Sequence, residues 1–247
     1  MELEMKADME QSPTMAQLHR EIVDCRRCPR LVAWREAVAV RRRSAYAGEE
    51  YWGRPLPGFG DLAARLVLVG LAPAAHGGNR TGRIFTGDRS GDWLWRALWR
   101  AGLANQAKSF GADDGLVANG VWVSAAVRCA PPANRPTPEE RDNCLPFLGR
   151  ELEVLTGARV TLALGSFAYD ACCQLFGARR HPRFGHGVEL RLADGRWLVC
   201  SYHPSQQNTF TGRLTEEMLD QVIGRAWQLA SNSFAAGGQA VARPSAG

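Results

Sequence analysis

Short apolar runs alternate with amphipathic stretches along this chain, and the alternation predicts strands followed by helices. Four runs have the composition of buried strands, at 66–70, 120–127, 160–164 and 197–201. Helices are expected around Leu18 and Ile22 and at 90–102, 166–176 and 216–230. Strands that alternate with helices favour an α/β fold, in which a mainly parallel sheet of four strands is covered on both faces.

Both ends of the chain differ in composition from the segment between them. Residues 1–16 are acidic and polar and residues 233–247 are rich in Ala, Gly and Pro, so we expect flexible tails around a single domain at 17–232. No apolar run approaches the roughly 20 residues that cross a bilayer. The acidic start also lacks the pattern of a signal peptide. A cytoplasmic protein is therefore expected.

The charge balance points weakly toward a polyanionic partner. The formal net charge is +5, and of the 30 basic residues all but Lys6 and Lys108 are arginine. The planar fork of arginine suits phosphates and base edges. A codon composition that favours arginine explains the same bias equally well, so charge alone does not establish nucleic-acid binding.

The spacing of the cysteines indicates a metal site. Seven cysteines are an odd number and nothing suggests an oxidising compartment, so a disulfide framework is not expected. Cys25 and Cys28 form a CxxC pair, while Cys129 and Cys144 flank a proline-rich loop. Four thiolates from two segments can surround either zinc or an iron–sulfur cluster, and spacing does not choose between them. The other cysteines are expected to fill the core: Cys172, Cys173 and Cys200.

Glycine-rich and polar loops follow the first and last predicted strands. Residues 70–91 are dense in small side chains, and residues 203–213 begin with His-Pro-Ser. In a parallel sheet both loops lie at the carboxyl ends of strands, where chemistry is usually found. Neither a Walker lysine nor GxGxxG is present, so a nucleotide cofactor is poorly supported. A small-molecule hydrolase that uses His203 and Asp88 is disfavoured because no GxSxG elbow occurs.

Three motifs in a fixed order carry a resemblance to a known family. They are GLAPAAHG at 70–77, GRIFTGDRSG at 82–91 and HPSQQNTFTGR at 203–213. Together with the four cysteines they resemble the uracil-DNA glycosylase superfamily. The particular residues of these motifs resemble its iron–sulfur family 5 (type B). The likeness extends from Cys25 to Ala230.

The resemblance implies a fold, a cofactor and an activity. The fold would be a three-layer α/β/α sandwich, and the enzyme would act as a monomer on DNA that contains uracil or other deaminated bases, including hypoxanthine and xanthine. It would hydrolyse the N-glycosidic bond of the damaged nucleotide. A structural [4Fe–4S] cluster would be held by Cys25, Cys28, Cys129 and Cys144.

Glycosidic hydrolysis gives three residues of the matching motifs specific roles. A base stacked in a duplex must be flipped into a pocket, where Phe85 would stack on it. His203 would donate a hydrogen bond to the departing base, and Asp88 would face the cationic sugar or the attacking water. Plainer roles exist: Phe85 could fill the core, and Asp88 could cap the helix that follows, whose N-terminus would keep it ionised.

The first motif has only Leu71, Ala72, Pro73 and Ala74 where most families of the superfamily place a polar catalytic residue. The water would then be positioned by backbone groups, by Asp88 or by His76. The residues expected to bind the substrate are Ala72, His76, Phe85, Asn134 and Asn208. Asn134 could equally be a turn residue among prolines. Ser205 and Arg213 are expected near phosphates, with Phe210 as a wedge in the base stack.

One rival interpretation is a nucleic-acid-binding module, stabilised by a metal, that lacks catalysis. It explains the arginines and the cysteines. It leaves Asp88 and His203 without a function.

Overall fold

A mainly parallel sheet lies at the centre of the computed structural model, which describes residues 14–232. Its strand order is β1-β3-β2-β4-β6-β5. Four strands are parallel: β2 (Leu66–Gly70), β3 (Val121–Ala125), β4 (Val160–Leu164) and β6 (Trp197–Ser201). Nearly every residue of these strands is buried, because helices cover both faces, and this explains the continuous apolar runs.

The expected sheet of four strands is corrected to six. Two short antiparallel strands form the edges: β1 (Phe59–Gly60) pairs with β3, and β5 (Glu189–Arg191) pairs with β6. Neither strand contains an apolar run, because both lie at the rim of the sheet and are only partly buried. The hydrophobic pattern therefore gives no signal for them.

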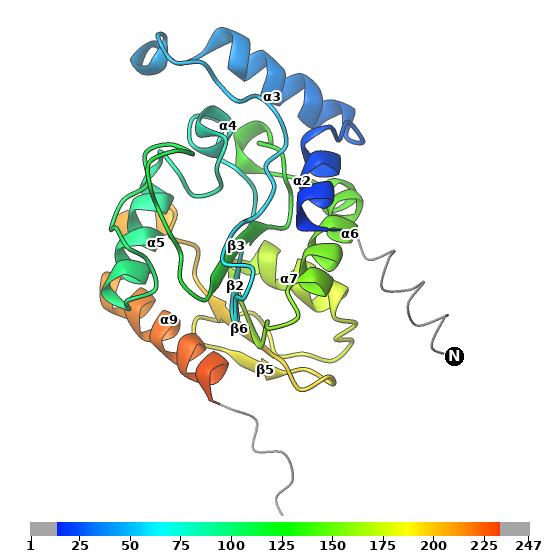
Figure 1. The fold of residues 1–247 in the computed structure, drawn as a ribbon, viewed down its shortest axis with the longest axis vertical. Coiled ribbons are helices and arrows are strands. Elements are labelled where there is room, and N and C mark those ends of the chain that lie inside the picture. The colour runs from blue at the N-terminus through cyan, green and yellow to red at the C-terminus, as the bar shows by residue number, and fades with distance from the viewer. Residues whose placement is uncertain (1–13, 233–247) are drawn as a thin grey trace, which may run out of the picture.

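Helices form the two outer layers. Their bounds are α2 (Met15–Val23), α3 (Pro29–Arg41), α4 (Gly78–Thr81), α5 (Arg89–Arg100), α6 (Pro138–Val154), α7 (Ser166–Leu175), α8 (Gln206–Phe210) and α9 (Glu216–Ser231), with 3₁₀ turns η1 (Ser44–Tyr46) and η2 (Pro132–Asn134). Helices α5 and α9 lie on one side of the sheet, and α2, α6 and α7 lie on the other (Figure 1). The expected α/β/α arrangement with a mainly parallel sheet is confirmed.

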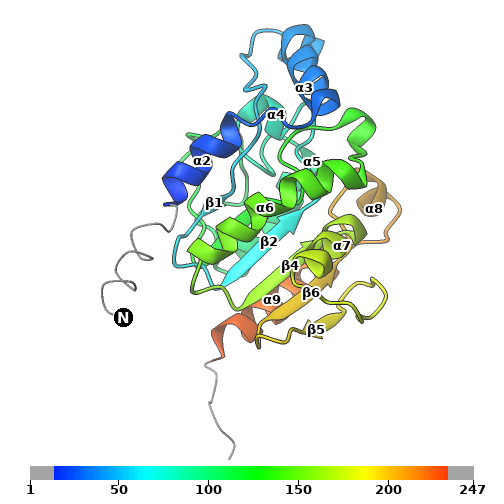
Figure 2. The ribbon, with the colours of Figure 1, turned by 90° about the vertical axis from the view of Figure 1, so that its right-hand side faces the viewer.

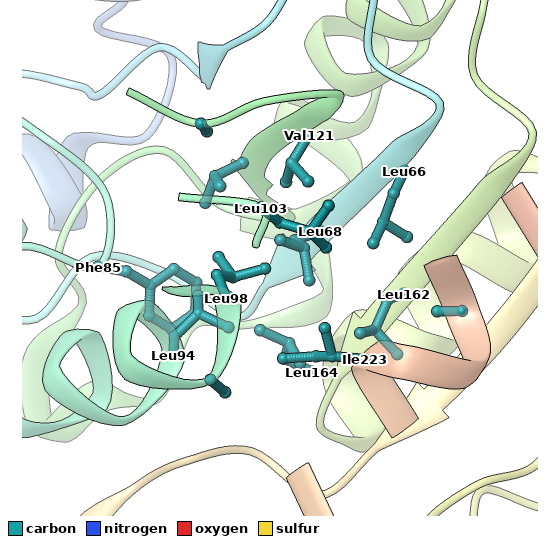
Figure 3. Close-up of a cluster of buried hydrophobic side chains, with 14 of the residues drawn as sticks. Leu66, Leu68, Phe85, Leu94, Leu98, Leu103, Val121, Leu162, Leu164 and Ile223 are labelled. Carbon is teal, nitrogen blue, oxygen red and sulfur yellow. The ribbon is translucent and has the colours of Figure 1, made fainter. Parts of the chain in front are cut away.

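Each layer has its own hydrophobic core. On one face, Leu94 and Leu98 of α5 and Ile223 of α9 pack against Leu66 and Leu68 of β2 (Figure 3). The other face of the same strand points into a second core. Its members include Leu18, Ile22, Val67, Val69, Trp122, Leu148 and Cys172. The three non-motif cysteines lie in this second core, as expected.

Two long helices, α3 and α6, had no sequence prediction. Helix α6 begins in the proline-rich loop, where Pro138 occupies the first turn and Thr137 and Glu140 form a capping box. Helix α3 begins directly after Cys28 with Pro29 in its first turn. At the N-terminus, α2 starts at Met15 after the cap residue Thr14, inside the expected tail of 1–16. The rest of both expected tails lies outside the described residues.

The carboxyl ends of the parallel strands all reach the same edge of the sheet, beside α8 (Figure 2). The loops after β2 and β6 leave from this edge. Within residues 14–232, no helix has both the length and the apolar character that a membrane crossing needs.

Candidate active site

A cavity of about 870 Å³ opens where the parallel strands end. The loops that follow β2, β4 and β6 line it, together with the turn that precedes α6. Nine of the residues singled out from the sequence reach this cavity: Ala72, His76, Phe85, Asp88, Asn134, His203, Ser205, Asn208 and Arg213. Phe210 does not line it; its side chain is 68% exposed at the end of α8.

Phe85 belongs both to the cavity and to the core. Its ring lies above Gly70, where an added Cβ would come within 2.8 Å of the ring. The ring also stacks on His203, with 5.8 Å between centroids and 29° between planes. The backbone of Phe85 has a φ of 53°, in the left-handed region that bulky residues avoid. Such strain persists only where the surroundings enforce it.

Buried contacts hold the strained turn from behind. The indole nitrogen of Trp95 donates to the carbonyl oxygen of Phe85 at 2.8 Å. The next residue, Thr86, shares a hydroxyl–hydroxyl hydrogen bond of 2.5 Å with Ser109 and accepts one from Arg83. Arg83 in turn forms a 2.6 Å ion pair with Asp114. This buried network rigidifies the loop that presents Phe85, and no sequence motif indicated Asp114 as a member of it.

Asp88 is the N-cap of α5 and also a partly buried residue of the cavity wall. Its Oδ1 accepts a hydrogen bond from the amide of Gly91 at 2.9 Å. Its Oδ2 lies against Gly77, where any side chain would collide with it. Burial raises the pKa of the Asp88 carboxyl, although the amides of Gly91 and Ser90 act in the opposite direction. The amides at the helix N-terminus favour the ionised form, in the expected direction, while desolvation is the larger influence on the pKa of Asp88.

His203 is a partly buried, neutral imidazole in the wall of the cavity. Burial lowers its pKa to about 4, so it carries no charge near pH 7. The carbonyl oxygen of His203 accepts a hydrogen bond of 2.9 Å from the side-chain amide of Asn208. Gly165, with a φ of 96°, leaves room for the His203 side chain. Asn208 thus braces the histidine loop, and Ser205 is the N-cap of α8.

The turn before α6 brings a polar side chain to the cavity. Asn134 lies in η2 with a φ of 55°, after Ala133 with a φ of 52°. It is both a turn residue and a cavity residue, so the two roles considered for it are compatible. Left-handed backbone is tolerated better by Asn than by most residues.

A segment that sequence reasoning missed closes one side of the cavity. Arg43 and Tyr46, which follow α3, line it. The guanidinium of Arg80 lies 4.0 Å from the centre of the Tyr46 ring and forms an ion pair with Glu49. Arginines also stack on aromatic rings at the opposite rim, Arg213 on Tyr202 at 4.6 Å and Arg89 on Phe210 at 4.2 Å.

The four motif cysteines surround a separate small hollow. Cys25, Cys28, Cys129 and Cys144 all line it, with apolar neighbours that include Leu31 and Phe147. All four are free thiols. Burial raises the pKa of Cys129 to about 12 and that of Cys144 to about 11.

Polar neighbours already contact two of these sulfurs. A guanidinium nitrogen of Arg35 lies 2.9 Å from Sγ of Cys129, and the amide of Asn143 lies 3.6 Å from Sγ of Cys28. Donors of this kind suit anionic sulfur. Among residues 14–232, no group of three or more His, Cys, Asp and Glu side chains forms a ready-made site for a single metal ion.

A buried ion pair ties the cysteine region to the sheet. Arg128 and Glu151 are 1% and 0% exposed and make two parallel hydrogen bonds of 2.9 and 2.7 Å. Glu151 also accepts hydrogen bonds from the hydroxyl of Ser124 and the amide of Gly58. Arg128 directly precedes Cys129, and Glu151 is on α6, the helix that carries Cys144. The pair therefore fixes two of the four cysteine positions relative to each other.

Comparison with known proteins finds close relatives. The model of the Uracil DNA glycosylase superfamily matches residues 57–226. A type-5 uracil-DNA glycosylase of Mycobacterium tuberculosis is 54% identical over 220 residues, which is 88% of this chain and 82% of that protein. One from Thermus thermophilus is 54% identical, over 83% of this chain and 94% of its own. A type-4 enzyme of Pyrobaculum aerophilum is 29% identical, over 77% and 83% of the two chains.

Proposed function

Because this chain belongs to the uracil-DNA glycosylase superfamily, we propose that it is a DNA repair glycosylase that hydrolyses the bond between uracil and deoxyribose. The observation that carries the proposal is the meeting of Phe85, Asp88 and His203 in one cavity at the strand ends. Their motifs lie more than a hundred positions apart in the chain. Its type-5 relatives are named as enzymes of this kind.

The cavity suits a single extruded base. Its volume of about 870 Å³ lies within the range of sites for small molecules. A base flipped out of the duplex would stack against the Phe85 ring. Ala72, Ala74 and Ala75 line the cavity with small side chains. This supports acceptance of the larger deaminated purines, hypoxanthine and xanthine, as well as uracil.

His203 would stabilise the departing base. When the C1′–N bond breaks, its electron pair leaves with the base, which becomes an anion, and the sugar becomes cationic. A neutral imidazole can donate its N–H to the developing anion without giving up the proton. The pKa of about 4 keeps His203 in that neutral form.

Asp88 would act on the other side of the broken bond. Its carboxylate would stabilise the cationic sugar and accept a proton from the water whose oxygen bonds to C1′. That proton can then pass to the base anion, so the products are a neutral base and an abasic site. The role requires the ionised form, and burial moves the pKa of Asp88 toward the working range of a general base.

Arginines without carboxylate partners frame the cavity and would bind DNA phosphates. Within residues 14–232, no Asp or Glu makes an ion pair with those that line it: Arg43, Arg89, Arg135 and Arg213. Three more exposed arginines follow α7, at 179, 180 and 183, and the loop that carries them continues to Phe184 at the cavity wall. The exposed ring of Phe210, capped by Arg89, would be the wedge in the base stack.

The four cysteines would hold a [4Fe–4S] cluster. All four line one hollow, and Arg35 and Asn143 supply donors to the sulfurs, so the residues present fit such a group. When bound, the cluster would supply a structural cross-link between the CxxC turn and α6. Action as a monomer and a cytoplasmic location stay predictions.

An excision assay tests the proposal. Protein purified without air is incubated with oligonucleotides that contain one uracil, hypoxanthine or xanthine, and abasic sites are then cleaved with alkali. We expect strand scission at uracil, none at thymine, and strongly reduced scission at uracil with an Asp88→Asn variant. DNA binding without scission on every substrate would instead favour the non-catalytic module.

A further inference from the structure

His76 is the one side chain from the first motif that could take part in proton transfer, and a buried tyrosine contacts it. Oη of Tyr51 lies 3.0 Å from Nδ1 of His76, and the two rings meet edge to face. Tyr51 is buried, whereas His76 is partly buried and lines the active cavity. The contact joins residues 25 positions apart in the chain.

The hydrogen bonds of the tyrosine determine which ring nitrogen of His76 carries the proton. The backbone amide of Arg43 donates to Oη of Tyr51 at 3.4 Å. That amide uses a lone pair of the hydroxyl, so the hydroxyl still has its own proton to donate. Within the described part of the chain, Nδ1 of His76 is the acceptor that this hydroxyl proton can reach. If Nδ1 were protonated instead, a buried hydroxyl proton would be left without an acceptor, which is unfavourable.

We propose that Tyr51 is a positioning residue that holds His76 as the Nε2–H tautomer, so that His76 donates a hydrogen bond into the active cavity and does not act as a base. The inference rests on the proposed glycosylase function. It leaves Asp88 as the group that accepts the proton of the attacking water. The acceptor for His76 is an oxygen, either of that water or of the extruded nucleotide.

The surroundings of His76 favour a neutral donor. Burial lowers the pKa of His76, and the nearby cations Arg43 and Arg80 lower it further. Arg80 also donates to the carbonyl oxygen of His76 at 2.8 Å and to that of Gly87 at 3.0 Å. This guanidinium therefore ties the His76 turn to the residue before Asp88. The histidine and the carboxylate are held in a fixed relation, one as donor and the other as acceptor.

A direct test reads the tautomer by NMR. Long-range proton–nitrogen correlations on histidine-labelled protein distinguish the two tautomers, and the His76 signals are identified by their loss in His76→Gln. We expect Nε2–H in the wild type and a mixed or Nδ1–H tautomer in Tyr51→Phe. Tyr169→Phe is the matched control, since it also removes a buried phenol hydroxyl, one that donates to Pro182 at 2.8 Å. It should leave the His76 signals unchanged.

An Nδ1–H tautomer in the wild type would overturn the proposal, as would a Tyr51→Phe spectrum with unchanged His76 signals. If Tyr51→Phe does not fold, the wild-type spectrum alone still decides. The measurement needs no excision, so it stands whether or not uracil proves to be the substrate.

Two substitutions of His76 then separate a donor from a base. Glutamine places an amide N–H near the position of Nε2 but cannot accept a proton at neutral pH, whereas leucine does neither. We expect single-turnover excision to fall about 3-fold in His76→Gln and about 30-fold in His76→Leu. Equal losses in both variants would indicate a base and contradict the proposal.

Binding assigns the oxygen that His76 contacts. DNA carrying a 2′-fluoro-uridine, which resists cleavage, is titrated against wild type and His76→Leu. Weaker binding of this DNA by the variant places the acceptor on the nucleotide. Unchanged binding with a slower single turnover places it on the water.

Discussion

The active cavity and the cysteine hollow are built in opposite ways. The cavity is large and is walled by loops, in which Phe85 and Asn134 have left-handed backbone and Gly77 leaves room for the carboxylate of Asp88. The hollow is small and apolar, and it lies between helices α3 and α6 beside a fully buried ion pair. The residues proposed for chemistry lie in loops at the ends of the strands, whereas the cysteine hollow is lined by parts of two helices: Cys28 is the N-cap of α3 and Cys144 lies within α6.

The sharpest contrast comes from removing the carboxylate that the cavity holds. Asp88→Asn keeps the shape and the helix cap but cannot accept a proton, so single-turnover excision should fall about 10³-fold. DNA affinity and the melting temperature should stay near wild type. Asp92→Asn, in the first turn of the same helix, is the matched control. An Asp88→Asn rate within a few-fold of wild type would remove the proposed role.

Because Asp88 must be ionised to act, the activity should fall on the acid side of the pH profile, giving an acid limb. Burial raises the pKa of Asp88 above its ordinary value. Activity should therefore fall as pH decreases through the raised pKa, and the limb should be absent in Asp88→Asn. His203 should add no limb between pH 5 and 8, because its pKa is about 4. Rates measured with saturating enzyme across that range check both statements.

Removing the buried ion pair beside the cysteine hollow should lower the stability of the protein rather than directly removing a catalytic group. Glu151→Gln removes the charge that Arg128 faces at 0% exposure, which should lower the free energy of unfolding by about 3–5 kcal/mol. Glu153→Gln on the same helix, outside that pair, should have little effect. Denaturant titration measures both, and a small loss in Glu151→Gln would show that the pair is dispensable.

Removing the imidazole of His203, the proposed hydrogen-bond donor to the leaving base, should lower the excision rate nearly as much as Asp88→Asn. It should leave DNA binding largely unchanged. His203→Ala should reduce single-turnover excision about 10²-fold with DNA binding largely kept. Because Phe85 stacks on this ring, a parallel His203→Phe variant keeps the stacking surface and removes only the donor. Comparable losses in the two variants would locate the effect in the N–H group. Recovery of activity in His203→Phe would contradict the donor role.

The cysteines offer a test of the hollow itself. Cys129→Ser should reduce bound iron, bleach the brown colour and lower the melting temperature by roughly 5–10 °C. Cys172→Ser, in the second core, should leave the iron content unchanged. Metal analysis of protein prepared without air decides the matter. A colourless wild type that carries zinc would overturn the cluster proposal.

The smallest expected effect concerns the outer arginines. Replacing Arg179, Arg180 and Arg183 together with glutamine should weaken DNA binding about 10-fold at physiological salt and reduce the slope of log K against log salt by up to about 3. The single-turnover rate at saturation should not change, because these residues lie beyond the cavity wall. An unaltered salt slope would exclude them from the DNA path.

The sequence predicted the parallel strands and the convergence of the cavity residues for one reason. Strands buried on both faces leave continuous apolar runs, and the direction of the strands then brings their following loops together. The loops that carry Phe85, Asp88 and His203 were located in this way, whereas the roles of these residues followed from the resemblance to the glycosylase family.

Features that depend on partners distant in the chain could not be predicted. The pairs Arg83–Asp114 and Arg128–Glu151 and the contact between Tyr51 and His76 join separate elements. The edge strands carry no apolar pattern, and a proline-rich start hid α6. The desolvation of Asp88, which has a larger influence on its pKa than the amides of the helix terminus, likewise could be seen only in the packed structure.

The left-handed turn at Phe85 implies a conflict between the stability of the fold and its activity. A bulky residue in that conformation costs about 1–2 kcal/mol relative to glycine. Phe85→Gly would relieve this strain while it removes the ring that faces His203 and the buried apolar area that the ring provides. Selection for thermal resistance alone would therefore favour a smaller residue here only if the core could close over the gap, and every such solution would discard the surface on which an extruded base rests.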